Sequence, residues 1–217
     1  MSTTVIVFAK APMPGLAKTR LVPALGADGA AALAGRMLRH ALAQAATAGI
    51  GPVELCAAPD AANPALQAAA AAHGAALTEQ GSGDLGQRMH RAFVRVLAGP
   101  GRALLIGTDA PALDAAMLRQ AAQALADHDA VFVPALDGGY ALVGLARPAP
   151  ALFDGVPWST SQVMAATRER ALAAGLRWTE LAPVADVDEP ADLAHLPAGW
   201  LGGLGGAGDA DPGAAPP

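Results

Sequence analysis

Charged side chains that could bind phosphate gather in one short segment near the amino terminus. Residues 9–21 follow an apolar run and contain three cations and a glycine: Lys10, Gly15, Lys18 and Arg20. Two prolines stiffen this loop, and cations held in a stiff loop suit a ligand phosphate. A P-loop would need glycines where the chain has Pro12 and Ala17, so kinase and ATPase chemistry is disfavoured. A basic surface loop without a ligand is the alternative.

Carboxylates that could bind a metal ion occur in two further segments. Asp109 follows the apolar run Leu104–Ile106, where a carboxylate at the end of a strand could bridge a divalent ion to phosphates. The acidic segment near the end of the chain contains Asp186, Asp188, Glu189 and Asp192, and one of these could complete the site. The alternatives are a turn aspartate at position 109 and a helix N-cap in the acidic segment.

Two glycine-containing loops could bind other parts of a substrate. The loop Gln80–Arg88 matches G-x-G-x-x-G at Gly81, Gly83 and Gly86, which leaves a dinucleotide site as a rival interpretation. That fingerprint belongs to the first strand-to-helix turn of its unit, whereas this loop follows the third strand. The second loop, Asp137-Gly138-Gly139-Tyr140, offers a carboxylate, an accessible backbone and an aromatic ring to a substrate, or is a plain turn.

Alternation of apolar runs with long alanine- and leucine-rich stretches predicts an α/β fold that can position these loops. We expect strands at Thr4–Phe8, Val53–Ala57, Ala75–Thr78, Ala103–Ile106, Ala130–Pro134 and Tyr140–Leu145. We expect helices at Asp28–Ala48, Pro64–His73, Leu85–Leu97, Asp114–Ala126 and Thr160–Ala174, the last capped by Ser159 or Thr160. The Gly138-Gly139 turn between two strands predicts a hairpin, and therefore a mixed, mainly parallel sheet.

Composition and length exclude several classes of protein. We expect residues 1–196 to form a single domain and the Gly-, Pro- and Ala-rich residues 197–217 to form a disordered tail. A net charge of −5 with scattered cations indicates no nucleic-acid partner. No apolar segment is long enough for a membrane span, and the single cysteine, Cys56, is expected to be a buried thiol, so a cytoplasmic location is predicted.

Six motifs, taken in order, resemble those of the DUF2064 family of glycosyltransferase-A-like proteins, of the type associated with radical-SAM proteins and selenodomains. They are Phe8–Gly15 with Lys18–Leu21, Gly83–Met89, Gly107–Pro111, Asp137–Tyr140, Trp158–Thr160 and Asp186–Leu193. The family is similar to 2-phospholactate guanylyltransferases and molybdenum-cofactor nucleotidyltransferases. The resemblance implies a Rossmann-like three-layer α/β/α sandwich of the glycosyltransferase-A type, which holds nucleotide-diphospho-sugars.

The resemblance also implies roles for individual residues. Lys18 and Arg20 would contact phosphates, the loop with Gln80, Gly81, Asp84 and Gly86 would hold base and ribose, and Asp109 with Asp188 would bind Mg²⁺ or Mn²⁺. Whether Asp186 or Asp188 is the second ligand stays open. The fourth-strand motif is Thr108-Asp109-Ala110-Pro111 rather than the D-x-D of typical glycosyltransferases.

Two transfer reactions and one binding role are compatible with these residues. Glycosyl transfer from a nucleotide-sugar to a small-molecule acceptor ranks first, with Lys18, Asp109 and Asp188 as the catalytic group. Nucleotidyl transfer with release of pyrophosphate ranks close behind, because the cations of the first loop suit a triphosphate. A nucleotide-binding protein without turnover is the third reading. The base, the sugar, the acceptor and the oligomeric state depend on pocket shape, which motifs do not specify.

Overall fold

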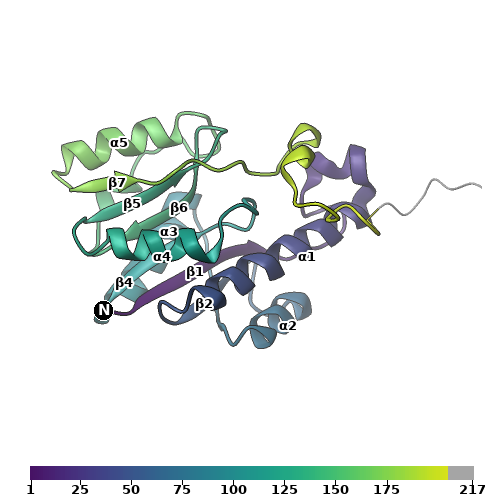
Figure 1. Ribbon diagram of the computed structural model, residues 1–217, viewed down its shortest axis with the longest axis horizontal. Coiled ribbons are helices and arrows are strands. Elements are labelled where there is room, and N and C mark those ends of the chain that lie inside the picture. Colours follow the sequence, from purple (N-terminus) through teal and green to yellow (C-terminus); the bar gives the residue numbers. More distant parts are fainter. Residues whose placement is uncertain (205–217) are drawn as a thin grey trace, which may run out of the picture.

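A computed structural model describes residues 1–204 and shows one sheet covered by helices on both faces (Figure 1). The strands are β1 (Thr3–Lys10), β2 (Val53–Ala58), β3 (Ala76–Glu79), β4 (Arg102–Ile106), β5 (Ala130–Pro134), β6 (Tyr140–Leu145) and β7 (Trp178–Glu180). The α-helices are α1 (Val22–Ala48), α2 (Pro64–Ala72), α3 (Leu85–Leu97), α4 (Ala115–Ala124) and α5 (Val163–Ala173). Short 3₁₀ helices are η1 (Thr19–Leu21), η2 (Pro150–Leu152) and η3 (Pro190–His195).

The strands lie in the order β3-β2-β1-β4-β6-β5-β7. Strand β6 runs antiparallel to both of its neighbours, β4 and β5, whereas every other strand pair in the sheet is parallel. The hairpin between β5 and β6 and the mixed, mainly parallel sheet are therefore confirmed. The carboxyl ends of β1 and β4, which pair directly, lie side by side and bring their following loops together.

Helices cover both faces of the sheet, and alternate side chains of each strand point to opposite faces, so each strand contributes to two buried cores. In β1, Val5 and Val7 pack into a core with apolar side chains of α1, α2 and α4, whereas Ile6 and Phe8 pack with those of α3 and α5. The three-layer α/β/α arrangement expected from the resemblance is confirmed. Cys56 of β2 is fully buried and is a free thiol, as predicted.

Helix α1, strand β7 and helix α5 differ from the sequence prediction. Helix α1 was expected from Asp28 but begins at Val22, and a kink at Gly26, with φ of 70° and ψ of 168°, separates its first residues from the part that the sequence predicted. Strand β7 was not expected, because three residues give no readable alternation, and it forms by pairing with β5. Helix α5 begins only at Val163, and neither Ser159 nor Thr160 caps it. Ser159 instead has a left-handed backbone with φ of 63°, and the Thr160 hydroxyl accepts from the Gln162 amide in a local turn. The Thr160 hydroxyl therefore belongs to the turn before the helix and not to a helix cap.

The carboxyl-terminal part of the described chain packs against the first half of α1 (Figure 1). Leu204 is 5% exposed, and the Trp200 ring lies edge-on to His40 with centroids 5.0 Å apart. Arg36 donates to the Trp200 carbonyl. Residues 197–204, assigned from composition to a disordered tail, are therefore part of the packed structure, because two large apolar side chains there find a partner surface. The rest of that predicted tail lies outside the described residues.

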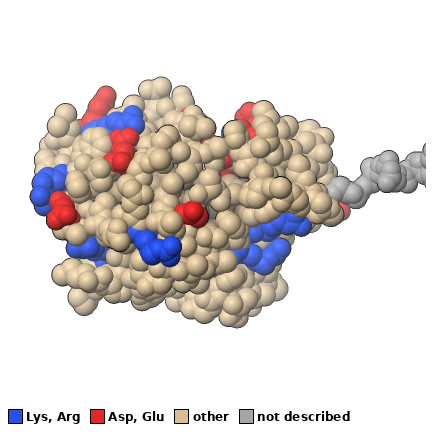
Figure 2. Space-filling model, viewed as in Figure 1, with Lys and Arg blue, Asp and Glu red and all other residues tan. Residues whose placement is uncertain are grey.

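Charged side chains are dispersed on the surface. In the face shown in Figure 2, Lys and Arg form small separate groups among acidic residues. Within residues 1–204, no helix combines the length and apolar character needed to cross a membrane. The cytoplasmic location stays a prediction.

Candidate functional site

The loop after β1 turns sharply and delivers Lys18 toward the sheet. The Met13 carbonyl accepts from the amides of Leu16 and Ala17, and Gly15 supplies a φ of 74° for the turn. Lys18 itself has φ of 49°, a left-handed conformation that is uncommon and strained for a residue with a side chain. Buried Ala17 on one side and the following short helix η1 on the other hold this conformation in place.

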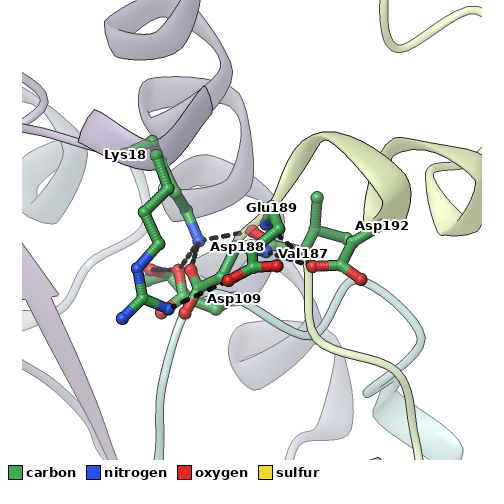
Figure 3. A network of polar contacts seen from close by, with 8 residues as sticks. Lys18, Asp109, Val187, Asp188, Glu189 and Asp192 are labelled. Atoms are coloured by element: carbon green, nitrogen blue, oxygen red, sulfur yellow. Dashed lines mark hydrogen bonds and ion pairs between the residues drawn. The ribbon is translucent and has the colours of Figure 1, made fainter. Parts of the chain in front are cut away.

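The ammonium group of Lys18 lies between two carboxylates that are far apart in the sequence (Figure 3). Its Nζ atom is 2.5 Å from Oδ1 of Asp109 and 2.7 Å from Oδ1 of Asp188, and it donates to the Val187 carbonyl at 2.7 Å. The Val187 amide donates to the Asp109 carbonyl at 2.8 Å, and the Val187 side chain is fully buried. The loop after β4 and the acidic segment are thus fastened together, with Lys18 at their junction.

The environment of Lys18 favours its charged form. Burial alone would lower its pKa, but the charges of Asp109 and Asp188 and the hydrogen bonds to both carboxylates outweigh burial, so the pKa lies above its ordinary value. The Lys18 side chain is only 8% exposed, whereas the side chains of Asp109 and Asp188 are 46% and 42% exposed. The carboxylates therefore remain open to a ligand from the solvent side.

The remaining acids of the carboxyl-terminal segment have different roles. Glu189 is the N-cap residue of the short helix η3, and Asp192 completes a capping box by accepting from the amides of Asp188 and Glu189 (Figure 3). Glu189 lies 3.7 Å from Arg20, and both side chains are mostly exposed. Burial, followed by the charges of neighbouring aspartates, raises the pKa of Asp186 above its ordinary value. The helix-cap interpretation of this segment thus holds for Glu189 and Asp192, while Asp188 shares the Lys18 ammonium with Asp109.

A cavity of about 530 Å³ opens at the carboxyl ends of β1 and β4. It lies between the first loop and the start of α3, and a volume of this size suits a nucleotide-sized ligand. The predicted site residues that line it are Lys10, Lys18, Arg20, Gln80, Asp109, Tyr140 and Asp188. Arg88 also lines it; this residue ends the loop Gln80–Arg88 that the resemblance assigns to base and ribose, but it was not among the individual site residues expected from the sequence.

Gln80 positions another side chain rather than presenting its own amide to the cavity. It is 5% exposed, and its Nε2 atom donates to the carbonyls of Cys56 at 3.0 Å and Ala9 at 3.3 Å. Its Oε1 atom accepts from Arg88 at 3.0 Å. Gln80 therefore connects the ends of β1 and β2 to Arg88, which leaves the guanidinium as the group that faces a ligand.

Three other residues of the loop Gln80–Arg88 have structural roles, and none of the three lines the larger cavity. Asp84 caps α3 in a capping box with Gln87. Gly81 has φ of 72°, and an added Cβ there would lie 2.7 Å from the Arg91 guanidinium. Gly86 allows Trp158 to approach, since a Cβ there would lie 2.6 Å from the indole nitrogen. Gly15 of the first loop likewise serves its turn and does not line the cavity.

A smaller cavity of about 230 Å³ adjoins the larger one and shares Asp109, Asp188 and Tyr140 with it. Of the hairpin residues, Asp137, Gly139 and Tyr140 line this smaller cavity, and Gly138 lies against the Ser161 backbone instead. Asp137 accepts from the Gly139 amide at 2.7 Å, which is the geometry of a turn. Burial raises the pKa of Tyr140 above its ordinary value, so the phenol is protonated at neutral pH.

The junction of the two cavities fits a divalent cation that also binds substrate phosphates. Asp109 and Asp188 both contact one ammonium ion, so their oxygens already surround a single positive charge. Among residues 1–204, no group of three His, Cys, Asp or Glu side chains could hold a metal by itself. Mg²⁺ is commonly bound through one or two carboxylates completed by water and phosphate oxygens, and this donor set matches that pattern.

The fold is that of glycosyltransferase-A and nucleotidyltransferase proteins. A structure from Desulfovibrio desulfuricans G20, named as a candidate nucleotide-diphospho-sugar transferase, superposes with a TM-score of 0.81 at 31% identity over 89% of this chain and 85% of that one. A nucleotidyl transferase from Methanothermobacter gives 0.62 at 15% identity over 92% and 98%. Glucosyl-3-phosphoglycerate synthase from Mycobacterium tuberculosis, in complex with Mn²⁺, UDP and its glucosyl product, gives 0.56 at 10% identity over 89% and 75%.

The chain belongs to the DUF2064 family, described as "uncharacterized protein conserved in bacteria". The family model matches residues 41–160, which include the loops after β3 and β4 and the hairpin. No curated protein sequence matches the chain significantly. The family membership inferred from the six motifs is confirmed.

Proposed function

We propose that the protein is a metal-dependent glycosyltransferase that binds a nucleotide-sugar in the larger cavity and a small-molecule acceptor in the smaller one. The observation that carries this proposal is the Lys18, Asp109 and Asp188 cluster at the junction of the two cavities. A diphosphate held there would place its sugar at the entrance to the smaller cavity. The names of the similar transferases support the same class of donor.

In this proposal, an acceptor hydroxyl oxygen bonds to the anomeric carbon of the donor, and the bond from that carbon to the diphosphate breaks. The nucleoside diphosphate leaves with the bonding electrons, and the hydroxyl proton passes to an aspartate of the smaller cavity. Lys10 and Arg88, which line the larger cavity and have no ion-pair partner among the described residues, orient the donor through its negative charge, and the closely packed hairpin orients the acceptor. A bound Mg²⁺ or Mn²⁺ held by Asp109 and Asp188 would stabilise the negative charge on the leaving diphosphate.

Nucleotidyl transfer is the second candidate, and the cations of the larger cavity favour it. A triphosphate needs several free cations or metal ions around it. Two of the three first-loop cations have acidic neighbours, Lys18 with Asp109 and Asp188 and Arg20 with Glu189. Lys10 has no ion-pair partner among the described residues. Because, within residues 1–204, only one of the three first-loop cations is free to bind a triphosphate, we rank glycosyl transfer before nucleotidyl transfer.

The products of each reaction distinguish the two candidates. Purified protein is incubated with a panel of nucleotide-sugars or nucleoside triphosphates, with Mg²⁺, Mn²⁺ or a chelator, and phosphorus NMR identifies the phosphate released. Metal-dependent release of a nucleoside diphosphate from a nucleotide-sugar supports glycosyl transfer. Release of pyrophosphate from a triphosphate, with no reaction of any nucleotide-sugar, contradicts it and supports nucleotidyl transfer.

A matched pair of variants ties any activity to the site. Asp109→Asn removes one charge at the junction of the cavities, whereas Asp127→Asn makes the same chemical change at an exposed position away from both. Activity that is lost in the first and retained in the second belongs to this site. Metal-dependent nucleotide binding without turnover across the whole panel would instead support the reading of a non-catalytic nucleotide-binding protein.

A further inference from the structure

The smaller cavity has a wall of packed aromatic side chains. The rings of Tyr140 and Trp158 meet edge to face, with centroids 6.4 Å apart, and Tyr140 also packs against the buried Phe132 at 5.9 Å. Gly86 lets the indole of Trp158 sit directly on the start of α3. Because this wall is braced on both sides, the cavity exists before a ligand enters.

The lining of the smaller cavity differs in charge from that of the larger one. Four carboxylates line the smaller cavity, those of Asp109, Asp137, Asp186 and Asp188, and none of its lining residues is Lys, Arg or His. The larger cavity is lined by four cations, Lys10, Lys18, Arg20 and Arg88, and shares only Asp109 and Asp188 of the acids. Lys18 offsets part of the charge of Asp109 and Asp188, so the negative charge particular to the smaller cavity is that of Asp137 and Asp186. On this account the two halves of one continuous site attract ligands of opposite charge.

Size restricts the ligand of the smaller cavity further. A volume of about 230 Å³ lies below the roughly 300–1,000 Å³ of cavities that hold drug-sized molecules, and it suits a single ring. Carboxylate oxygens accept hydrogen bonds from hydroxyl and ammonium groups, and an aromatic wall accepts the apolar face of a ring or a cation. A phosphate or carboxylate on the ligand would face like charges on several sides.

We propose that the smaller cavity binds a single-ring polyhydroxy compound that carries no negative charge, and that an amine on this ring strengthens binding. Calling this compound the acceptor rests on the proposed function, whereas its binding does not. The division of charge keeps the anionic donor in the larger cavity and the acceptor in the smaller one, so that neither ligand competes for the other's place.

Three single-ring sugars that differ in charge test the proposal: one is positive, one is neutral and one is negative. Glucosamine, glucose and glucuronate are titrated into the full chain near neutral pH, with and without Mg²⁺, and binding is followed by saturation-transfer NMR. We expect glucosamine to bind most tightly and glucuronate at least about tenfold more weakly than glucosamine, because of like-charge repulsion. Glucuronate that binds as tightly as glucose, in either condition, overturns the proposal.

Variants of the smaller cavity test whether the sugars bind there, and they separate the effect of its charge on binding from the effect of its aromatic wall. Asp137→Asn keeps an oxygen that can accept from the Gly139 amide but removes one negative charge, so the preference for glucosamine over glucuronate should narrow several-fold. Trp158→Ala should weaken binding of glucosamine and glucose together. Asp127→Asn, exposed and outside the cavity, should change nothing. A charge preference unchanged in Asp137→Asn assigns the sugars to another surface and overturns the proposal.

Failure of this proposal and failure of the proposed function give different results. If nucleotide-sugars bind and react while none of the three sugars binds to the nucleotide-loaded protein, the acceptor proposal is wrong and the glycosyltransferase proposal stands. If the sugars bind in the expected order while no nucleotide-sugar binds, the glycosyltransferase proposal is wrong and the proposal for the ligand of the smaller cavity stands.

Discussion

The Lys18 ammonium lies 2.5 Å from the Asp109 carboxylate and simultaneously holds Asp188, which is 170 positions later in the chain. A lysine side chain thus supplies the positive charge at the point where we propose that a metal ion binds. This arrangement has consequences for metal binding, because two cations cannot occupy the same space between two carboxylates. It also has consequences for stability, because the carboxylates repel each other without a cation.

Removing the ammonium should expose the carboxylate pair to metal. In Lys18→Met, Mn²⁺ binding without nucleotide should strengthen at least about tenfold, because Asp109 and Asp188 lose their internal counterion. Electron paramagnetic resonance of free Mn²⁺ measures this directly. Lys10→Met removes a cation from the wall of the same cavity and should have a much smaller effect. Equal Mn²⁺ affinity in wild type and Lys18→Met would show that Lys18 does not compete with metal.

The same substitution should destabilise the metal-free protein in a pH-dependent way. Because both carboxylates are nearly half exposed, we expect a loss of about 1–2 kcal/mol in the free energy of unfolding rather than the larger loss of a fully buried pair. The pKa of Lys18 is raised in the folded state, so its contribution is fully present below the unfolded value near 10.5 and is lost as pH rises through the folded value. Urea denaturation of both proteins from neutral to strongly alkaline pH checks this. A difference that grows with rising pH would contradict it.

Gln80 should affect nucleotide binding through Arg88. Arg88→Met should weaken nucleotide binding about tenfold, and Gln80→Met should weaken it by a similar factor because the guanidinium loses its oriented partner. In the double variant, Gln80→Met should add little to the loss of affinity while still lowering stability by about 1–3 kcal/mol, since two carbonyls lose their donor. Isothermal titration and urea denaturation measure the two quantities. Additive losses of affinity would mean that Gln80 contacts the nucleotide itself.

Gly86 should be intolerant of a methyl group. An added Cβ would lie 2.6 Å from the Phe153 carbonyl oxygen and from the Trp158 indole nitrogen, so Gly86→Ala should lower stability by roughly 1–3 kcal/mol and shift the fluorescence of Trp158. Gly99→Ala is the matched control, because its nearest neighbour would be 3.7 Å away. Equal thermal stability of the two variants would show that the contact between α3 and Trp158 is not tight.

The packed carboxyl-terminal segment should contribute to stability. A chain ending at Leu196 lacks Trp200 and the buried Leu204 and uncovers apolar side chains of α1, so it should be about 2–4 kcal/mol less stable than a chain ending at Leu204. Urea denaturation of the two truncated chains measures the difference. Equal stability would mean that these eight residues behave as the tail expected from their composition.

The sequence alone determined the elements of the fold and the loops that carry the site. Strands such as Ala130–Pro134 and helices such as Leu85–Leu97 could be located because apolar periodicity and capping residues act over a few neighbouring positions. The sharp turn at Gly138 predicted the antiparallel hairpin for the same reason. Asp109 and the first loop could be singled out because carboxyl ends of strands meet at one edge of a sheet.

Only the tertiary structure decided what those loops do together. The sequence could not show that Lys18 binds Asp109 and Asp188, that Gln80 turns inward to hold Arg88, or that Trp200 and Leu204 pack on α1. Each of these contacts joins segments that are distant along the chain, and its geometry depends on strand order and helix placement. The separation of a basic cavity from an acidic one has the same origin, since the charge around a cavity is the sum over residues that folding brings together.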